Sequence, residues 1–411
     1  MNYRKNRITY YFEIFQFILF YLPFAFFLAL GPFPIYFFSI SIENISSLLV
    51  GISLAALLLS RRSQQNSRKI STNYVLLFFY LSLMPSVLFS SNLDLSASRF
   101  FIFSAYFLLF AISININYSL YFYKKIYYIS LLSLVIVCLL IIYLYFFSDY
   151  SETVRFALAS NFDDYANEGQ FAESGAVDPN MTAIGLVLTF ALCIPGIKTS
   201  DNFRFRNFKL VCISCLLLIA LWCLQSRTGL IAYSLILVFV HFGKLSKFLT
   251  VKVLLFLFVF LIILVSFAIL AAGDTAEYWA RFDLKYILQY ESEPGGRIDH
   301  INRSFSDILT SGKSLILGVG FFTSNPHNEF LRIFRDSGIL SGLIFIFFLI
   351  IFYLNLKRDA IRLHAKSNFL NASFFPLLFM LTTYGHTKTL WAGLVFSYIV
   401  SQVDFYKIEN L

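Results

Sequence analysis

The sequence predicts an all-α polytopic integral membrane protein with about twelve transmembrane helices. Of its 411 residues, 58% are hydrophobic and 13% are charged, whereas soluble domains contain roughly 45–50% apolar and about 25% charged residues. The aromatic share of 19%, with 51 Phe, represents more apolar surface than a water-soluble core of this length can bury. In addition, many uncharged runs approach the roughly 20 residues that a bilayer core requires.

Apolar runs bounded by charged and turn residues predict the individual spans. We expect helices at 12–30, 35–59, 73–89, 98–117, 126–147, 179–197, 210–226, 229–242, 253–272, 338–356, 369–385 and 390–404. No internal repeat or low-complexity linker divides the chain. Residues 1–411 are therefore expected to form a single transmembrane domain.

The basic residues predict the orientation of the spans. Most of the 32 Lys and Arg residues fall in alternate connections, from Arg4 and Lys5 near the start to Lys407 near the end. Cytoplasmic loops collect such residues, so we expect both termini in the cytoplasm. The net charge of +9 then reflects topology, and it predicts no nucleic-acid partner because the charges form no continuous patch.

Two connections on the external side are long, at 148–178 and 273–337, and loops of this length are commonly functional. The first is rich in acidic residues, which we expect to form a solvated surface, and it contains one basic residue, Arg155. Two interpretations of Arg155 stay open. It is either the structural counter-ion of these acids or a group that faces a substrate at the membrane.

The second long loop is predicted to contain an amphipathic helix at the outer membrane surface. Between Arg297 and Leu309, apolar residues recur three, four and three positions apart, at Ile298, Ile301, Phe305 and Ile308. This spacing predicts one apolar stripe on a helix. Arg297, His300 and Ser304 share another face, and Pro294-Gly295-Gly296 provides a flexible entry.

A second amphipathic helix is predicted from Asn325, as N-cap, and Pro326, as first helical residue, to the region of Gly338. His327 and Asn328 would lie in its first turn. A helix start favours an anion and disfavours imidazolium, so a neutral His327 would suit a general base near pH 7. The alternative is that His327 only caps its own helix.

Arg227 interrupts an otherwise uncharged stretch, within Gln225-Ser226-Arg227-Thr228-Gly229. Alternation of the spans places it at the external end. A charge near hydrocarbon is costly and is usually retained for a partner or a substrate, and the planar guanidinium suits phosphate. The alternative is an arginine that extends to lipid phosphate.

Five segments in this order carry a resemblance to a known family. They are Ser226 to Gly229 (SRTG), Gly295 to Arg297 (GGR), Leu317 to Gly320 (LGVG), His327 to Leu331 (HNEFL) and Asp336 to Gly342 (DSGILSG). Together they resemble the bacterial O-antigen ligase and Wzy-type O-antigen polymerase superfamily. Asp178-Pro179-Asn180, where the first long loop re-enters the membrane, also resembles polymerase members.

The resemblance implies a fold of the C-type glycosyltransferase class in the bacterial inner membrane, with its active site on the periplasmic face. It implies a metal-independent transfer of undecaprenyl-diphosphate-linked glycan to a sugar hydroxyl, without a cofactor. Arg227 and Arg297 would stabilise the leaving diphosphate, and His327 would accept or orient the acceptor hydroxyl proton. We further expect substrate binding by Arg155, Asn328, His300, Asp178 and Asn180. His300 and His327 have no recognised metal-ligand spacing.

Three functions stay open, and polymerase is favoured. A polymerase of O-antigen or capsule joins lipid-linked repeat units, with a chain-length regulator and a flippase as further partners. A ligase transfers the glycan to lipid A core. A lipid-linked oligosaccharide flippase is less favoured, because transporters place ionisable groups at mid-membrane in related halves, whereas the unusual charges here lie at external ends and loops.

Overall fold

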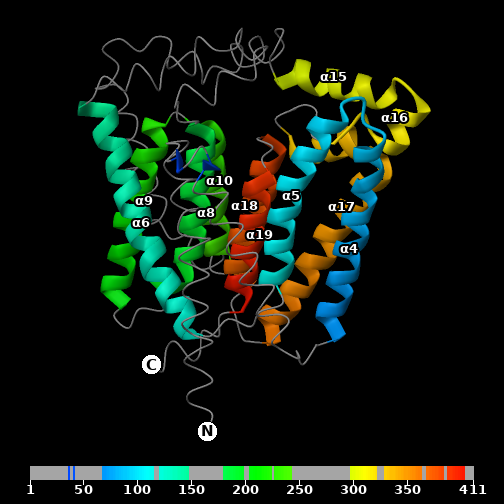
Figure 1. The fold of residues 1–411 in the computed structure, drawn as a ribbon. Helices are drawn as coiled ribbons and strands as arrows, with labels where there is room; N and C mark the ends of the chain where they lie inside the picture. Colours follow the sequence, from blue (N-terminus) through cyan, green and yellow to red (C-terminus); the bar gives the residue numbers. More distant parts are fainter. Residues whose placement is uncertain are drawn as a thin grey trace.

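Helices account for nearly all of the chain that the computed structural model describes (Figure 1). The described residues are 36–37, 40–41, 67–114, 120–147, 179–198, 203–224, 226–242, 297–321, 328–362, 367–383 and 387–402. The helices are α4 (Ser67–Leu88), α5 (Leu93–Ser113), α6 (Leu120–Phe147), α8 (Pro179–Lys198), α9 (Phe203–Cys223), α10 (Arg227–Phe242), α15 (Arg297–Leu309), α16 (Gly312–Leu317), α17 (Glu329–Arg362), α18 (Ser367–Thr383) and α19 (Thr387–Ser401).

From residue 67 onward, a described helix overlaps each predicted run other than 253–272, although the ends differ by up to nine residues, as at Glu329 against 338. The runs predicted from 73–89 to 229–242 correspond to α4, α5, α6, α8, α9 and α10, and those from 338–356 to 390–404 correspond to α17, α18 and α19. Helix α15 has the bounds predicted for the first amphipathic helix. The runs predicted at 12–30 and 253–272 lie outside the described residues.

The start of the run predicted at 35–59 is not helical. Strands β1 (Tyr36–Phe37) and β2 (Ile40–Ser41) pair antiparallel there, with Tyr36 opposite Ser41. Pro34 lies two positions before Tyr36, just ahead of the predicted run. The aromatic and β-branched residues that follow suit a strand as well as a membrane span, which explains why composition alone predicted the wrong element.

Two of the described helices are long and apolar enough to cross a membrane. They are Tyr123–Phe147 within α6 and Glu329–Arg362, which is α17. The apolar stretches of other helices, such as Thr182–Lys198 within α8 and Asn207–Cys223 within α9, are shorter than 18 residues. The described part of the chain is therefore a helical fold with two candidate membrane spans.

Helices α17 and α4 run antiparallel, and so do α6 and α8. Asn355 near the end of α17 donates a hydrogen bond to Thr72 near the start of α4 (Nδ2 to Oγ1, 2.7 Å). The Tyr123 hydroxyl, near the start of α6, donates to the carbonyl oxygen of Leu192 and accepts from the backbone N–H of Gly196 in α8. These hydrogen bonds thus join residues that are far apart in the sequence but lie at the same level of the bundle.

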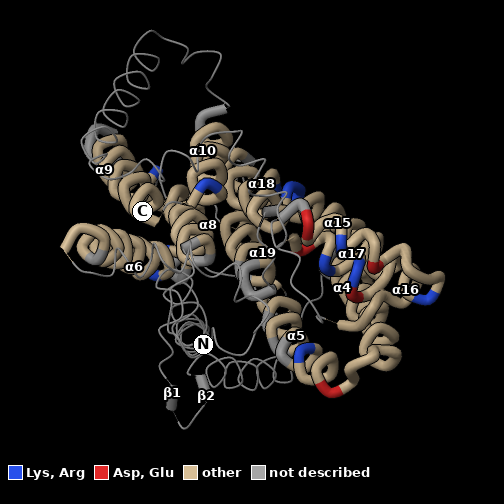
Figure 2. The backbone as a smooth tube through the Cα atoms, turned by 90° about the horizontal axis from the view of Figure 1, so that it is seen from above, with Lys and Arg blue, Asp and Glu red and all other residues tan. Residues whose placement is uncertain are grey.

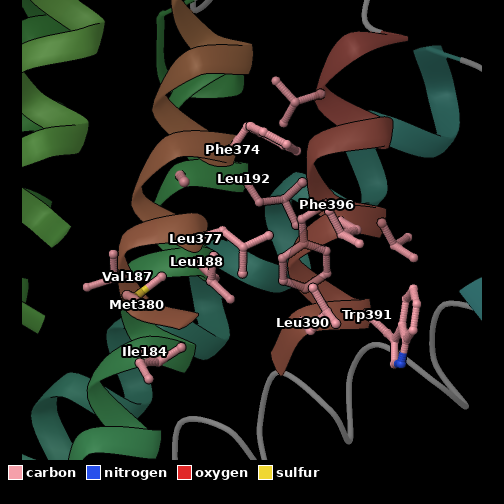
Figure 3. Close-up of a cluster of buried hydrophobic side chains, with 14 of the residues drawn as sticks. Ile184, Val187, Leu188, Leu192, Phe374, Leu377, Met380, Leu390, Trp391 and Phe396 are labelled. Atoms are coloured by element: carbon pink, nitrogen blue, oxygen red, sulfur yellow. The ribbon is translucent and has the colours of Figure 1, made fainter. Parts of the chain in front are cut away.

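An aromatic cluster fills the core between α5, α17 and α19. The buried ring of Trp391 in α19 lies 5.0 Å from the ring of Phe110 and 5.6 Å from that of Phe103, centroid to centroid. Edge-to-face contacts of this kind stabilise beyond the apolar area that they bury. Figure 3 shows the adjoining core, where side chains such as Leu188 of α8 and Leu377 of α18 meet those of α19.

Helix α17 bends at Gly338, whose φ of 82° and ψ of 169° are not helical. The segment Leu317 to Gly320 packs its backbone against this bend. The N–H groups of Val319 and Gly320 donate to the carbonyl oxygens of Arg335 and Asp336, at 3.0 and 3.3 Å. The backbone groups freed by the bend therefore find partners in the preceding loop.

Glycine is required at both contacting positions. A Cβ atom at Gly338 would lie 2.0 Å from the carbonyl oxygen of Ile316, and one at Gly318 would lie 2.2 Å from that of Asp336. Both residues also have positive φ, at 82° and 80°, a conformation that side chains disfavour. Neither clash can be relieved by rotation of a side chain, because the atoms met are backbone.

We predict that Gly338→Ala lowers the stability of the protein by about 2 kcal/mol or more, through backbone strain and the clash with Ile316. Gly312→Ala is the matched control, because a Cβ there meets nothing within 4 Å, and its effect is expected within about 0.5 kcal/mol. Thermal unfolding of the purified variants in one detergent measures both. Equal melting temperatures for the two variants would contradict this account of the bend.

Candidate functional site

The SRTG and DPN segments meet where α8 and α10 begin. Ser226 precedes the first residue of α10, and its hydroxyl accepts from the N–H of Gly229 (3.2 Å) while donating to Oδ1 of Asn180 in α8 (3.0 Å). Ser226 is thus the N-cap of α10, and Pro179 is the first residue of α8, where proline is preferred. One hydroxyl therefore ties together two segments that the sequence separates by 46 positions.

The close approach of these two helix starts depends on Gly229. A Cβ atom at this position would lie 2.8 Å from Cβ of Ala183. Arg227 is the first residue of α10 and is half-buried, and Thr228 beside it is buried. Helix starts carry partial positive charge, so two of them beside a guanidinium make this junction electrically favourable for an anion.

Helices α15, α16 and the first segment of α17 form a second group at the same end of the molecule (Figure 1). Seen from above, α15 and α16 lie over α17 and α4, and α18 lies between α15 and α10 (Figure 2). Phe321, which follows the loop at 317–320, is buried against Phe100 and Phe103 of α5, with centroids 5.2 and 5.3 Å apart. The loop is thereby fixed to the helical core as well as to α17.

Charged side chains concentrate at the contact of α15 with α17. Nε and Nη2 of Arg335 lie 2.7 and 2.6 Å from Oδ2 of Asp307, and Nη1 lies 3.5 Å from Oδ1 of Asp336. Arg332 forms an ion pair with Glu329, and both are buried. Buried charges persist where they are paired and hydrogen-bonded, and these two sets of contacts pair three acids with two arginines.

His300 and Asn328 are the predicted residues described in this group. His300 is half-buried on α15, and its carbonyl oxygen accepts from the hydroxyl of Ser304 (2.7 Å). Asn328 lies directly before α17, and its Oδ1 accepts from the N–H of Leu331 (2.9 Å). Asn328 is therefore the N-cap of α17, which begins at Glu329 and not at Pro326 as predicted.

The buried face of α15 also differs from the predicted apolar stripe. Ile308 is buried, as expected, but so is Ser304, whereas Phe305 is 52% exposed. Burial of Ser304 is tolerated because its hydroxyl is satisfied by the carbonyl one turn earlier. The helix is thus rotated so that Ser304 and Ile308 lie inward and Phe305 lies outward.

The structure does not describe the side chains of four predicted site residues. Arg155, Asp178 and His327 lie outside the described residues. The backbone of Arg297 is described as the first residue of α15, but its side chain is not. Among the predicted residues, the structure brings Asn180 together with the segment of Arg227, and it places His300 on the helix that packs against α17. The approach of Arg227, Arg297 and His327 to one another stays a prediction.

The sequence analysis missed the ion pairs made by Arg332 and Arg335. Glu329 and Arg332 are three positions apart, a spacing that brings side chains together on a helix, so this pair was open to prediction. The contact of Arg335 with Asp307 spans 28 positions, and no local spacing indicates it. No protein-family model matches the chain, and neither does any curated protein.

We predict that Ser226→Ala destabilises the protein by about 1 kcal/mol, because α10 loses its N-cap and Asn180 loses a donor. Ser234→Ala is the control in the same helix, since its exposed hydroxyl only bonds the carbonyl of Leu230, and it should change stability by less than about 0.5 kcal/mol. Melting temperatures in detergent test this. A Ser226→Ala variant as stable as Ser234→Ala would show that the junction is not held by this hydroxyl.

Proposed function

We propose that this chain is a polytopic membrane glycosyltransferase that polymerises a surface polysaccharide. It transfers a glycan from undecaprenyl diphosphate to a sugar hydroxyl of another lipid-linked repeat unit on the external face of the bacterial inner membrane. The observation that carries the proposal is that the segments of the family resemblance meet in pairs. Ser226 of SRTG bonds Asn180 of DPN, and LGVG packs its backbone against the bend at DSG.

Lipid-facing surfaces on the long helices support the membrane location. The exposed large apolar side chains of α6 recur every three or four residues along one face, at Tyr128, Leu132, Ile136, Leu139, Tyr143 and Phe146. Those of α17 do the same, at Leu340, Leu343, Phe347, Ile350 and Leu354. A soluble monomer rarely exposes so large a continuous apolar surface, whereas hydrocarbon is the natural surrounding for it.

The distribution of charge supports the proposed orientation. The end of the bundle opposite α15 carries basic residues at Arg68, Lys69, Lys124, Lys125, Lys198, Arg204, Arg206, Lys209, Lys357, Arg358 and Arg362. Among the described residues of that end, Asp359 is the single acid. Cytoplasmic ends of membrane helices show this excess of basic residues, so α15, α16 and the start of α10 would face the outside.

The chemistry expected of the proposed reaction fits the residues of the site. Glycosyl transfer develops positive charge on the sugar and negative charge on the departing diphosphate. Arg227, at the junction of two positive helix starts, would stabilise the diphosphate as it leaves, together with Arg297. His327 would accept or orient the proton of the acceptor hydroxyl. Because each buried methylene of a polyprenyl tail contributes about 0.8 kcal/mol, the donor stays in the bilayer and the enzyme must reach it there.

We predict that Arg227→Ala, Arg297→Ala and His327→Ala each reduce polymer formation about a hundredfold, the usual loss for one group that stabilises the transition state. The readout is the polysaccharide ladder of cells in which each variant replaces the chromosomal copy. Membrane insertion and melting temperature of each variant should match those of the parent protein.

Arg303→Ala is the matched control for Arg297→Ala, because it removes an arginine from the exposed side of the same helix. It should leave the ladder intact. A normal ladder from any of the three site variants would exclude that residue from the proposed role.

The acceptor distinguishes a polymerase from a ligase and from a flippase. We predict that proteoliposomes given lipid-linked repeat units alone form ladders, because donor and acceptor are then the same class of molecule. Transfer that begins only when lipid A core is added would identify a ligase. Movement of lipid-linked glycan across the bilayer without a new glycosidic bond would identify a flippase.

A further inference from the structure

We infer that Arg335 and Asp307 are positioning residues that hold α15 in place over α17. Arg297 and His300 stand at the start of α15, and Asp307 stands near its end. The inference rests on the proposed function, since the start of α15 has to be placed for the transfer reaction. It assigns a role to two residues that touch neither donor nor acceptor.

Arg335 contacts three segments of the second group. Two guanidinium nitrogens bind Asp307 of α15, the third approaches the buried Asp336, and the backbone carbonyl accepts from Val319 in the loop at 317–320. The side chain of Arg335 is 14% exposed and that of Asp307 is 40% exposed. A pair that is partly shielded from water is screened less by salt than a fully exposed pair.

Few of the described side chains of helix α15 are fully buried. Ser304 and Ile308 are buried, while Phe305 and Leu309 are largely exposed. A second ion pair joins Asp299 to Arg303 within α15 itself. Burial of one apolar side chain and one hydroxyl provides little attachment, and the ion pair of Asp307 with Arg335 adds a charged contact between α15 and α17.

The contact of Asp307 with Arg335 lies near the end of α15, and it affects where the start of the helix lies. Figure 1 shows α15 running from above the centre of the bundle toward α16 at its edge. Arg297 lies ten positions before Asp307, which is about 15 Å along a helix. If α15 rotates by a small angle about Asp307, Arg297 is therefore displaced farther than the residues beside Asp307. Misplacement of a catalytic group by about 1 Å can cost a hundredfold in rate.

The test compares Asp307→Asn with Asp307→Glu and Arg303→Gln. Asp307→Asn removes the charge that Arg335 binds, Asp307→Glu keeps it, and Arg303→Gln breaks the ion pair internal to α15. Hydrogen–deuterium exchange of the full-length protein in detergent reports on the amides of 297–309 without any substrate. Asp307→Asn should raise their exchange about five- to tenfold, while Asp307→Glu and Arg303→Gln should stay near the parent protein.

Polysaccharide ladders of cells carrying the same variants provide the second readout. Asp307→Asn should reduce polymer about tenfold or more, with Asp307→Glu restoring most of it and Arg303→Gln unaffected. Unchanged exchange in Asp307→Asn would overturn the inference, and so would raised exchange with a normal ladder. If deletion of the whole gene leaves the ladder intact, the proposed function fails and the positioning role fails with it, while the exchange result still decides whether the pair anchors α15.

Discussion

The backbone contact between the loop at 317–320 and the bend in α17 is the constraint on which the group of α15, α16 and the first segment of α17 depends. Gly318 and Gly338 approach carbonyl oxygens of the opposite segment so closely that neither can carry a Cβ atom. Two backbone hydrogen bonds, from Val319 and Gly320, then take up carbonyl groups at the bend. Since an unpaired buried backbone group costs about as much as a lost hydrogen bond, bend and loop stabilise each other and neither would persist alone.

The bend separates two chemical environments within one helix. Before Gly338, α17 carries Glu329, Arg332, Arg335 and Asp336, which find partners among themselves and in α15. After Gly338 its sequence carries no charge over 339–356, with one face exposed along Leu343 and Phe347. Polar groups near hydrocarbon need partners within the protein. A helix built in this way joins the charged group at its start to the apolar bundle.

Local patterns in the sequence predicted the parts of the fold that local physics determines. The bounds of α15 followed from apolar spacing and from the glycines before it, and the break near Gly338 followed from the preference for glycine after a helix. The start of α17 was misplaced because Asn325 and Asn328 are both competent caps and the sequence alone does not distinguish them. The pairing of Arg335 with Asp307 was beyond sequence reasoning, since it depends on how two distant helices pack.

The two groups at the α15 end of the molecule differ in electrostatic character, and this difference bears on how the proposed reaction would be organised. The junction of α8 and α10 joins two positive helix starts to Arg227, so in the proposed reaction it would favour the diphosphate of the donor. The contact of α15 with α17 holds Asp307, Glu329 and Asp336, whose charges Arg332 and Arg335 largely compensate. A compensated group repels an anion less than bare carboxylates would. Helix α15 runs from this group toward the centre of the bundle, and the end that begins at Arg297 is the central one (Figure 1). This end lies on the side of α18 and α10 (Figure 2). In the proposed reaction the donor phosphate would therefore occupy the α10 side, with the start of α15 reaching toward it.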